Sequence, residues 1–137
     1  MNEQFGKLER MNMDAYINKQ TFTTTTVSIT KGQAEIGLTV EPKYFHALGA
    51  IHGSVYFKLL DDAAFFAVNS IVEDVFVLTK SYEIHFIRPV VEGKIRATGT
   101  YLSPDGKEYI AKAELRNEGG KLDGSGEGIY DKSQISL

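Results

Sequence analysis

The segment 54–70 constrains the fold more than any other part of the chain, because it is apolar on nearly every side of a helical wheel. One stripe at helical spacing consists of Val55, Leu59, Ala63 and Phe66, and the opposite side carries a second apolar set of Phe57, Leu60, Ala64, Ala67 and Val68. A helix that is apolar all round has to be enclosed by the rest of the protein. The sequence therefore predicts one long central helix with other elements wrapped around it.

The segments on either side of this helix alternate apolar and polar residues with the period of a β-strand. The candidate strands are residues 21–30, 34–40, 76–88, 94–102, 109–116 and 122–130, and turn signals at Lys31-Gly32, 103–106 and 118–121 separate several of them. Within 76–88, one face is expected to carry Phe76, Leu78, Tyr82, Ile84 and Phe86. In the last strand, glycines at 124, 126 and 128 leave one face bare for close approach by another element.

This order of elements indicates an α+β fold, in which one curved antiparallel sheet of five or six strands wraps around the central helix. The short turns after that helix favour a meander of consecutive strands. Residues 2–18 predict a short N-terminal helix, and a partly frayed N-terminal arm is the alternative. The length of 137 residues favours a single domain over 1–137.

Composition excludes several classes of function. A net charge of -3 argues against a nucleic-acid partner, and the absence of cysteine excludes thiol catalysis and Cys-ligated zinc. The N-terminal residues do not read as a secretory signal, and no stretch approaches the roughly 18 apolar residues of a membrane span. We therefore expect a cytoplasmic protein that binds neither nucleic acid nor membrane.

Two neighbouring carboxylates, Asp61 and Asp62, interrupt the apolar helix. A carboxylate is costly to bury alone, so each must be paired, protonated or functional. An ion pair with Lys58, three and four residues earlier, is one interpretation. Catalysis by one aspartate is the other, since apolar neighbours would raise the pKa of Asp61 and make it a better base near neutral pH.

His52-Gly53-Ser54 marks the expected start of the helix. The free N–H groups and partial positive charge of a helix N-terminus suit an anion or a polarised carbonyl, and a glycine lets the ligand approach closely. An ordinary helix start is the alternative. The histidines at 46, 52 and 85 match no zinc-site spacing, so no metal is expected. Lys80, Arg88 and Lys94 are suited either to phosphates or to a solvated rim.

Residues 46–54 (HALGAIHGS) followed by residues 59–63 (LLDDA) resemble the hotdog-fold acyl-CoA thioesterases of the phenylacetate-degradation type, the PaaI-like family. The pattern of that family is an Asn, then G-x-x-H-G-G at the helix start, then L-x-D-x-A two turns into the helix. The nine-residue step from His52 to Asp61 matches this pattern. The order of elements also fits a hotdog core over about residues 20–131.

The resemblance implies that Asp61 is the nucleophile or general base and that the Gly53 N–H polarises the thioester carbonyl. It also implies that His52 holds the loop at the helix start and that Thr79 orients water. Two positions depart from the family, because His46 stands in place of the Asn and Ser54 replaces the second Gly. A neutral His46 can still donate a hydrogen bond to the carbonyl, and a changed substrate or weak activity is the alternative.

The implied substrate is an acyl-CoA. Its acyl group would lie among aromatic residues that include Phe57 and Phe65, which are equally suited to the core, while Lys80 and Arg88 are candidates for its phosphates. Coenzyme A is part of this substrate, so no cofactor is expected. The alternatives are a non-catalytic acyl-CoA-binding module and a hotdog hydratase or dehydratase that uses His46 or His85.

Gly53 and Asp61 lie eight residues apart, which separates them by about 12 Å along a helix. One thioester carbon cannot be within the attack distance of about 3 to 3.5 Å of a group at each place. We therefore expect a two-fold homodimer, in which antiparallel helices bring Gly53 of one protomer towards Asp61 of its partner. A homotetramer built as a dimer of dimers is also compatible with this spacing.

Overall fold

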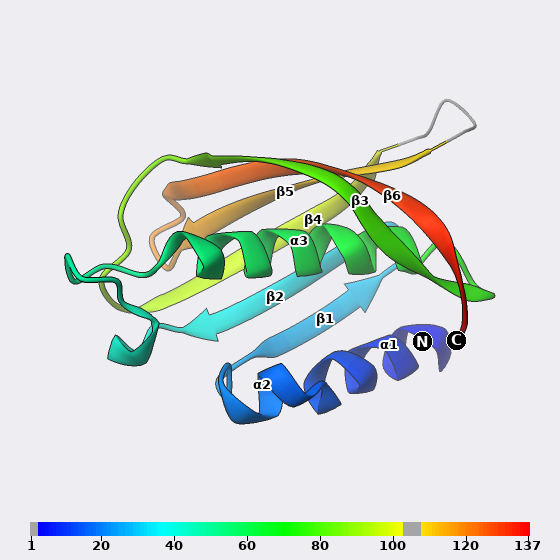
Figure 1. The fold of residues 1–137 in the computed structure, drawn as a ribbon, viewed down its shortest axis with the longest axis horizontal. Coiled ribbons are helices and arrows are strands. Elements are labelled where there is room, and N and C mark those ends of the chain that lie inside the picture. The colour runs from blue at the N-terminus through cyan, green and yellow to red at the C-terminus, as the bar shows by residue number, and fades with distance from the viewer. Residues whose placement is uncertain (1–2, 103–107) are drawn as a thin grey trace.

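The computed structural model describes residues 3–102 and 108–137, and it consists of one curved sheet around a central helix (Figure 1). The helices are α1 (Glu3–Asp14), α2 (Tyr16–Gln20), the 3-10 helix η1 (Pro42–Tyr44) and α3 (Gly53–Asn69). The strands are β1 (Thr26–Thr30), β2 (Gln33–Thr39), β3 (Val75–Phe86), β4 (Lys94–Leu102), β5 (Tyr109–Asn117) and β6 (Leu122–Ser136). The predicted α+β architecture is confirmed. The turn predicted at 103–106 lies outside the described residues.

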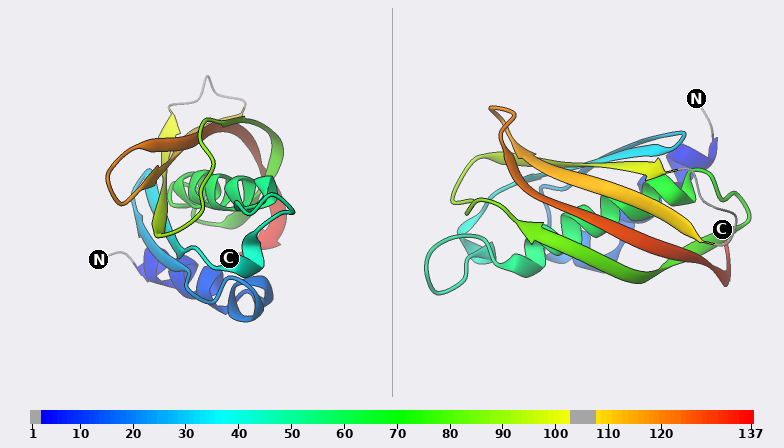
Figure 2. Two further views of the ribbon diagram at one scale, coloured as in Figure 1. Left: turned by 90° about the vertical axis from the view of Figure 1, so that its left-hand side faces the viewer. Right: turned by 90° about the horizontal axis from the view of Figure 1, so that it is seen from above.

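The six strands pair in the order β1-β2-β4-β5-β6-β3, and every pair is antiparallel. The meander prediction holds for β4, β5 and β6 but is wrong for β3, which pairs with β6 at the far edge of the sheet. A sheet that encloses a helix needs strands on both sides of it. Residues 87–93 therefore carry the chain across from β3 to β4, and the sheet curls around α3 in the end-on view of Figure 2.

The predicted enclosure of the long helix is confirmed, because most of α3 is buried against the inner face of the sheet. The closest approach is at Gly99 of β4, where an added Cβ would lie 2.2 Å from the carbonyl oxygen of Ala63 and 2.6 Å from the nitrogen of Ala64. Both atoms belong to the backbone of α3, so neither can turn away. Gly99 therefore sets how closely the helix packs on the sheet.

Replacing Gly99 with Ala is expected to lower the free energy of unfolding by about 3 kcal/mol, because the new methyl group overpacks the core against backbone atoms. The melting temperature then falls by roughly 10 °C. Gly119→Ala is the matched control, since its nearest contact is 3.4 Å away and its φ is not left-handed. Equal melting temperatures for the two variants would contradict this packing argument.

The N-terminal segment forms two helices instead of the single helix predicted over 2–18. Ala15 takes an extended backbone conformation with ψ 134°, which ends α1 and begins α2. The Asn18 side chain donates to the Asn12 carbonyl oxygen at 2.7 Å, which otherwise accepts only a longer bond of 3.3 Å from the Ala15 N–H at the break. Leu8 is fully buried and α1 packs along β1, so this segment is not a frayed arm (Figure 1).

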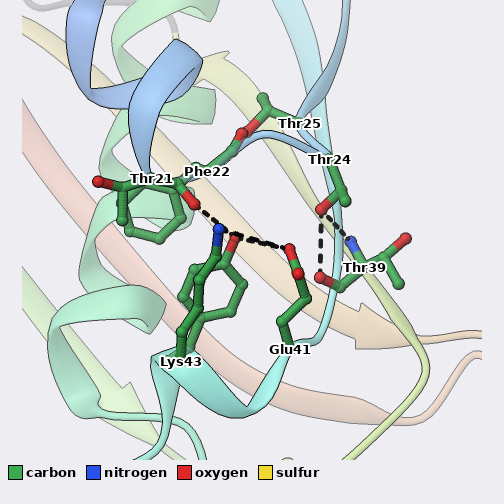
Figure 3. A network of polar contacts seen from close by, with 8 residues as sticks. Thr21, Phe22, Thr24, Thr25, Thr39, Glu41 and Lys43 are labelled. Atoms are coloured by element: carbon green, nitrogen blue, oxygen red, sulfur yellow. Dashed lines mark hydrogen bonds and ion pairs between the residues drawn. The ribbon is translucent and has the colours of Figure 1, made fainter.

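The strand predicted over 21–30 begins only at Thr26, because Thr24 and Thr25 use their hydroxyls on nearby backbone groups (Figure 3). The Thr24 hydroxyl donates to the Thr39 carbonyl at 3.1 Å and accepts from the Thr39 N–H at 3.0 Å. The Thr25 hydroxyl bonds to the Phe22 carbonyl oxygen. These bonds tie the segment to the end of β2 without strand pairing.

A bulge in β3 changes which of its residues face the helix. The register with β6 shifts between Thr79 and Ser81, so the alternation reverses at this point. Val77 is fully buried, whereas Leu78 is 53% exposed, and the predicted inner position of Leu78 is therefore wrong. Thr79 lies before the bulge and two residues after Val77, so it is on the same face, towards α3, where it bonds to Asp61.

No helix among the described residues combines the length and the apolar character that crossing a membrane would require.

Candidate active site

The N-terminus of α3 presents one backbone donor without an acceptor. His52 is the N-cap of the helix, and its Nδ1 lies 3.0 Å from the Ser54 nitrogen and 2.8 Å from the Ser54 hydroxyl oxygen. Gly53 is the first helical residue, and its N–H donates to no group among residues 3–102 and 108–137. This N–H is therefore available, at the positive end of the helix dipole, for a carbonyl oxygen or an anion.

A cavity of about 290 Å³ opens beside this donor. Its lining includes Gly53 and two predicted binding residues, His46 and Arg88. The other lining residues are Ala50, Ile51, Tyr56, Phe86, Ile87 and Pro89. Nδ1 of His46 accepts from the Leu48 N–H at 3.0 Å, so a neutral His46 ring carries its proton on Nε2 and can donate there. The structure thus brings His46, Gly53 and Arg88 together.

Arg88 is held in this cavity by a buried carboxylate. The side-chain Nε of Arg88 lies 3.3 Å from Oδ1 of Asp123, a residue that is 1% exposed. The backbone N–H of Arg88 donates to the Asp123 carbonyl oxygen at 3.0 Å. Burial raises the pKa of Asp123, and the neighbouring guanidinium opposes that rise. The guanidinium is still partly exposed, so the geometry suits it to a phosphate group.

The second cluster of polar groups surrounds Asp61, two turns further along α3. Oδ1 of Asp61 accepts hydrogen bonds from the Thr79 hydroxyl at 3.0 Å and from the Tyr130 hydroxyl at 2.9 Å. Burial is the main influence on Asp61 and raises its pKa, while these two hydrogen bonds partly offset the rise. A carboxylate with a raised pKa is a stronger base, which agrees with the chemistry expected from the sequence.

The adjacent residues Asp61 and Asp62 have different partners. Lys58 pairs with Asp62 at 2.6 Å, and its ammonium group lies 4.9 Å from the centre of the Phe22 ring. The ion-pair interpretation therefore applies to Asp62, and Lys58 acts on Asp61 only as a more distant charge. Of the two carboxylates, Asp61 is the one without an ion pair among the described residues.

Of the other predicted binding residues, Ser54 lies at the start of α3 beside His52, and Phe57 and Phe65 lie on α3 near Asp61. Phe57 and Phe65 are four residues on either side of Asp61, and they pack edge-to-face against Tyr82 at 5.5 Å and Tyr130 at 6.3 Å. Lys80, the extra residue of the β3 bulge, is paired with two carboxylates, Glu108 at 2.8 Å and Asp131 at 3.9 Å. Its ammonium group is thus already engaged.

Within one protomer these two clusters do not form a single site. The eight residues between Gly53 and Asp61 correspond to about 12 Å along α3. The described residues also contain no group of three His, Asp or Glu side chains that could hold a metal ion. The arrangement offers a carboxylate base in one place and a carbonyl-binding donor in another.

Tyr130 is a site residue that the sequence did not single out. The signal is the inner face of β6, where glycines at 124, 126 and 128 are followed at the same spacing by Tyr130. The bare face predicted from these glycines is confirmed, because added Cβ atoms at Gly126 and Gly128 would lie 2.3 and 2.6 Å from the ring of Tyr82.

Comparison with known proteins places this geometry in context. A family model described as "Thioesterase superfamily" matches residues 48–123, which is more than half of the chain. No curated protein sequence matches.

Solved structures match over nearly the whole chain. The Escherichia coli PaaI protein of the phenylacetic acid degradation operon is 19% identical, with 97% of this chain and 98% of that chain covered and a TM-score of 0.83. A conserved protein of Pseudomonas aeruginosa is 24% identical over 90% and 98% of the two chains, with a TM-score of 0.80. A thioesterase of Haemophilus influenzae is 16% identical over 95% and 90%, with a TM-score of 0.79. At these identities the likeness shows the fold, and the expected hotdog architecture is confirmed.

Proposed function

Because the chain belongs to the thioesterase superfamily, we propose that it hydrolyses an acyl-CoA thioester to a free carboxylic acid and coenzyme A. The observation that carries this proposal is the state of Asp61. It is a partly buried carboxylate on a central helix, with one oxygen held by two hydroxyls and no ion pair to a cationic side chain in the described part of the chain. A protein that only bound an acyl-CoA would be more stable without that charge.

The proposed reaction assigns one task to each cluster. Asp61 either removes a proton from the attacking water or attacks the thioester carbon itself. The carbonyl oxygen gains negative charge as the new C–O bond forms, and the Gly53 N–H stabilises that charge at the helix N-terminus. Collapse of this intermediate breaks the C–S bond. If water is the nucleophile, the free acid forms in this step and the proton held by Asp61 passes to the departing thiolate. If Asp61 is the nucleophile, the thiolate takes a proton from solvent, and water then hydrolyses the acyl-aspartyl anhydride to the free acid and restores the carboxylate.

This division of tasks requires two protomers, since Gly53 and Asp61 of one chain are too far apart. The free edge of β3 supports a two-fold homodimer, because it carries exposed apolar residues, namely Leu78 and Phe86, with Ile87 directly after the strand. Phe57 adds an exposed ring on the side of α3 near Asp61. A pair of such dimers would make the homotetramer.

The substrate contacts follow from the same geometry. Phe57 and Phe65 flank Asp61 and suit an aryl or medium-length acyl group, while Arg88 and His46 line the cavity beside Gly53. Arg88 is a candidate for a phosphate of coenzyme A. Lys80 would have to exchange its two carboxylate partners to play that part.

The test is an assay of thiol release on a panel of aryl and medium-chain acyl-CoAs, with hydration of an enoyl-CoA measured in parallel. We expect thiol release with a kcat/KM of about 10⁴ M⁻¹ s⁻¹ or more for the best substrate. Hydration without thiol release would identify a hydratase instead. Tight acyl-CoA binding without turnover of any member would identify a binding module.

A further inference from the structure

The two hydroxyls on Asp61 come from neighbouring strands and bind the same oxygen. Thr79 of β3 and Tyr130 of β6 are directly paired in the register of the sheet, and both donate to Oδ1. Oδ2 accepts no hydrogen bond from the described residues. The carboxylate is therefore held asymmetrically, with one oxygen occupied and the other free.

Packing of the Tyr130 ring against the helix places its hydroxyl beside Oδ1 of Asp61. Tyr130 is 0% exposed, and its ring packs edge-to-face on Phe65 of the helix. Burial and the charge of Asp61 both raise the pKa of Tyr130, so its hydroxyl stays protonated and acts as a donor. Thr79 precedes the bulge and faces α3 as Val77 does, and its hydroxyl reaches the same carboxylate oxygen.

We propose that Tyr130 is a positioning residue for the reaction, whose hydroxyl holds Oδ1 of Asp61 so that Oδ2 is the oxygen that acts on the substrate. This inference rests on the proposed thioester hydrolysis. Oδ1 already accepts two hydrogen bonds, so a proton taken from water goes to Oδ2. If Asp61 instead attacks the thioester carbon, Oδ2 is again the oxygen that forms the bond.

The groups that surround Asp61 allow the effect of Tyr130 to be isolated. On α3 the charged neighbours are Asp62, which raises the pKa of Asp61, and Lys58, which lowers it. From β3 the titratable neighbour is Tyr82, and from β6 it is Tyr130 itself. Tyr130→Phe leaves the other three groups in place and removes the bond to Oδ1, together with a longer contact of 3.4 Å from the same hydroxyl to the Asp61 carbonyl oxygen.

The sign of the effect follows from that bond. A hydrogen bond donated to a carboxylate favours its charged form, so its removal raises the pKa of Asp61. Since the ionised form is the active base, the acidic limb of kcat/KM against pH should move up by about one pH unit. Tyr130→Phe is expected to lower kcat/KM about tenfold on this acidic limb and by a smaller factor on the high-pH plateau. A residue that merely supported the fold would lower both regions alike.

Tyr82→Phe is the matched control. Tyr82 is also a partly buried tyrosine near Asp61, but its buried hydroxyl has no partner among the described residues. Its removal should leave the acidic limb in place, and the folded protein should be at least as stable, since an unpaired buried hydroxyl is costly.

The direct readout is a ¹³C NMR titration of the Asp61 carboxyl carbon in the wild type and both variants, assigned with Asp61→Asn. A higher Asp61 pKa in Tyr130→Phe alone supports the proposal, even if no thioester is turned over, in which case only the proposed function fails. An unchanged Asp61 pKa in folded Tyr130→Phe overturns the positioning role, whatever the activity.

Discussion

Replacing Asp61 with Asn is expected to lower kcat/KM for the best acyl-CoA by a factor of about 100 or more while the protein stays folded. The Asn side chain has the same shape, and its oxygen can still accept from the Thr79 and Tyr130 hydroxyls. It cannot take a proton from water or attack the thioester. Steady-state rates of thiol release, with the melting temperature as a check on folding, measure the effect.

The same substitution makes a prediction about stability with a defined sign. Burial raises the pKa of Asp61 in the folded protein above its unfolded value. The protonated group therefore favours folding below the unfolded pKa, and this contribution is lost as the pH rises through the folded pKa. At pH 7 Asp61→Asn should melt no lower than the wild type, because it no longer buries a charge.

Asp62→Asn is the control for the neighbouring position. Its oxygen can still accept from Lys58, so the fold should persist, and the variant should keep most of its thioesterase activity. A fully active Asp61→Asn beside an inactive Asp62→Asn would reverse the assignment of the two aspartates.

Replacing Gly53 with Pro is expected to lower kcat by about 100-fold, because it removes the one N–H that would bind the developing oxyanion. Proline is well tolerated as the first residue of a helix, where its missing N–H breaks no helical bond. His52, with φ -64° and ψ 146°, already has the conformation that a following proline requires. The helix should therefore form in the variant.

Gly53→Ala is the matched control for this substitution. It places the same Cβ 3.1 Å from the Phe86 ring but keeps the N–H, so it reports the steric effect alone. The difference in kcat between the Ala and Pro variants measures the contribution of the donor. Equal rates would remove the Gly53 N–H from the mechanism.

The elements were largely predictable because their signals are local. The all-round apolar pattern of 54–70 predicts α3, and the alternation of the strands predicts the β4-β5-β6 meander. The predicted ends lie within one residue of the observed ones, except that β6 continues beyond residue 130 to Ser136. The place of β3 beside β6 was not predictable, because it depends on how the whole sheet closes around the helix. The bulge at Lys80 is a similar case, since only the pairing with β6 reveals it.

In the candidate site, too, local sequence patterns were predictable, whereas contacts made only through the fold were not. The step from His52 to Asp61 is a sequence pattern, so both ends of the proposed site could be named from the residues. The partner of Lys58 could not be predicted, because both Asp61 and Asp62 lie within its reach in the sequence. In the structure Lys58 pairs with Asp62. Tyr130 could not either, because it is 69 residues from Asp61 and meets it only through the fold.

The central claim is that Gly53 of one protomer and Asp61 of its partner act on the same thioester. The most direct measurement co-expresses Asp61→Asn and Gly53→Pro chains with different tags, purifies the mixed dimer on both tags, and compares its thiol release with that of the two parent dimers. A shared site predicts about half of the wild-type activity per dimer, because one of the two sites is then built from unaltered residues. A mixed dimer no more active than the average of its inactive parents would contradict the shared site.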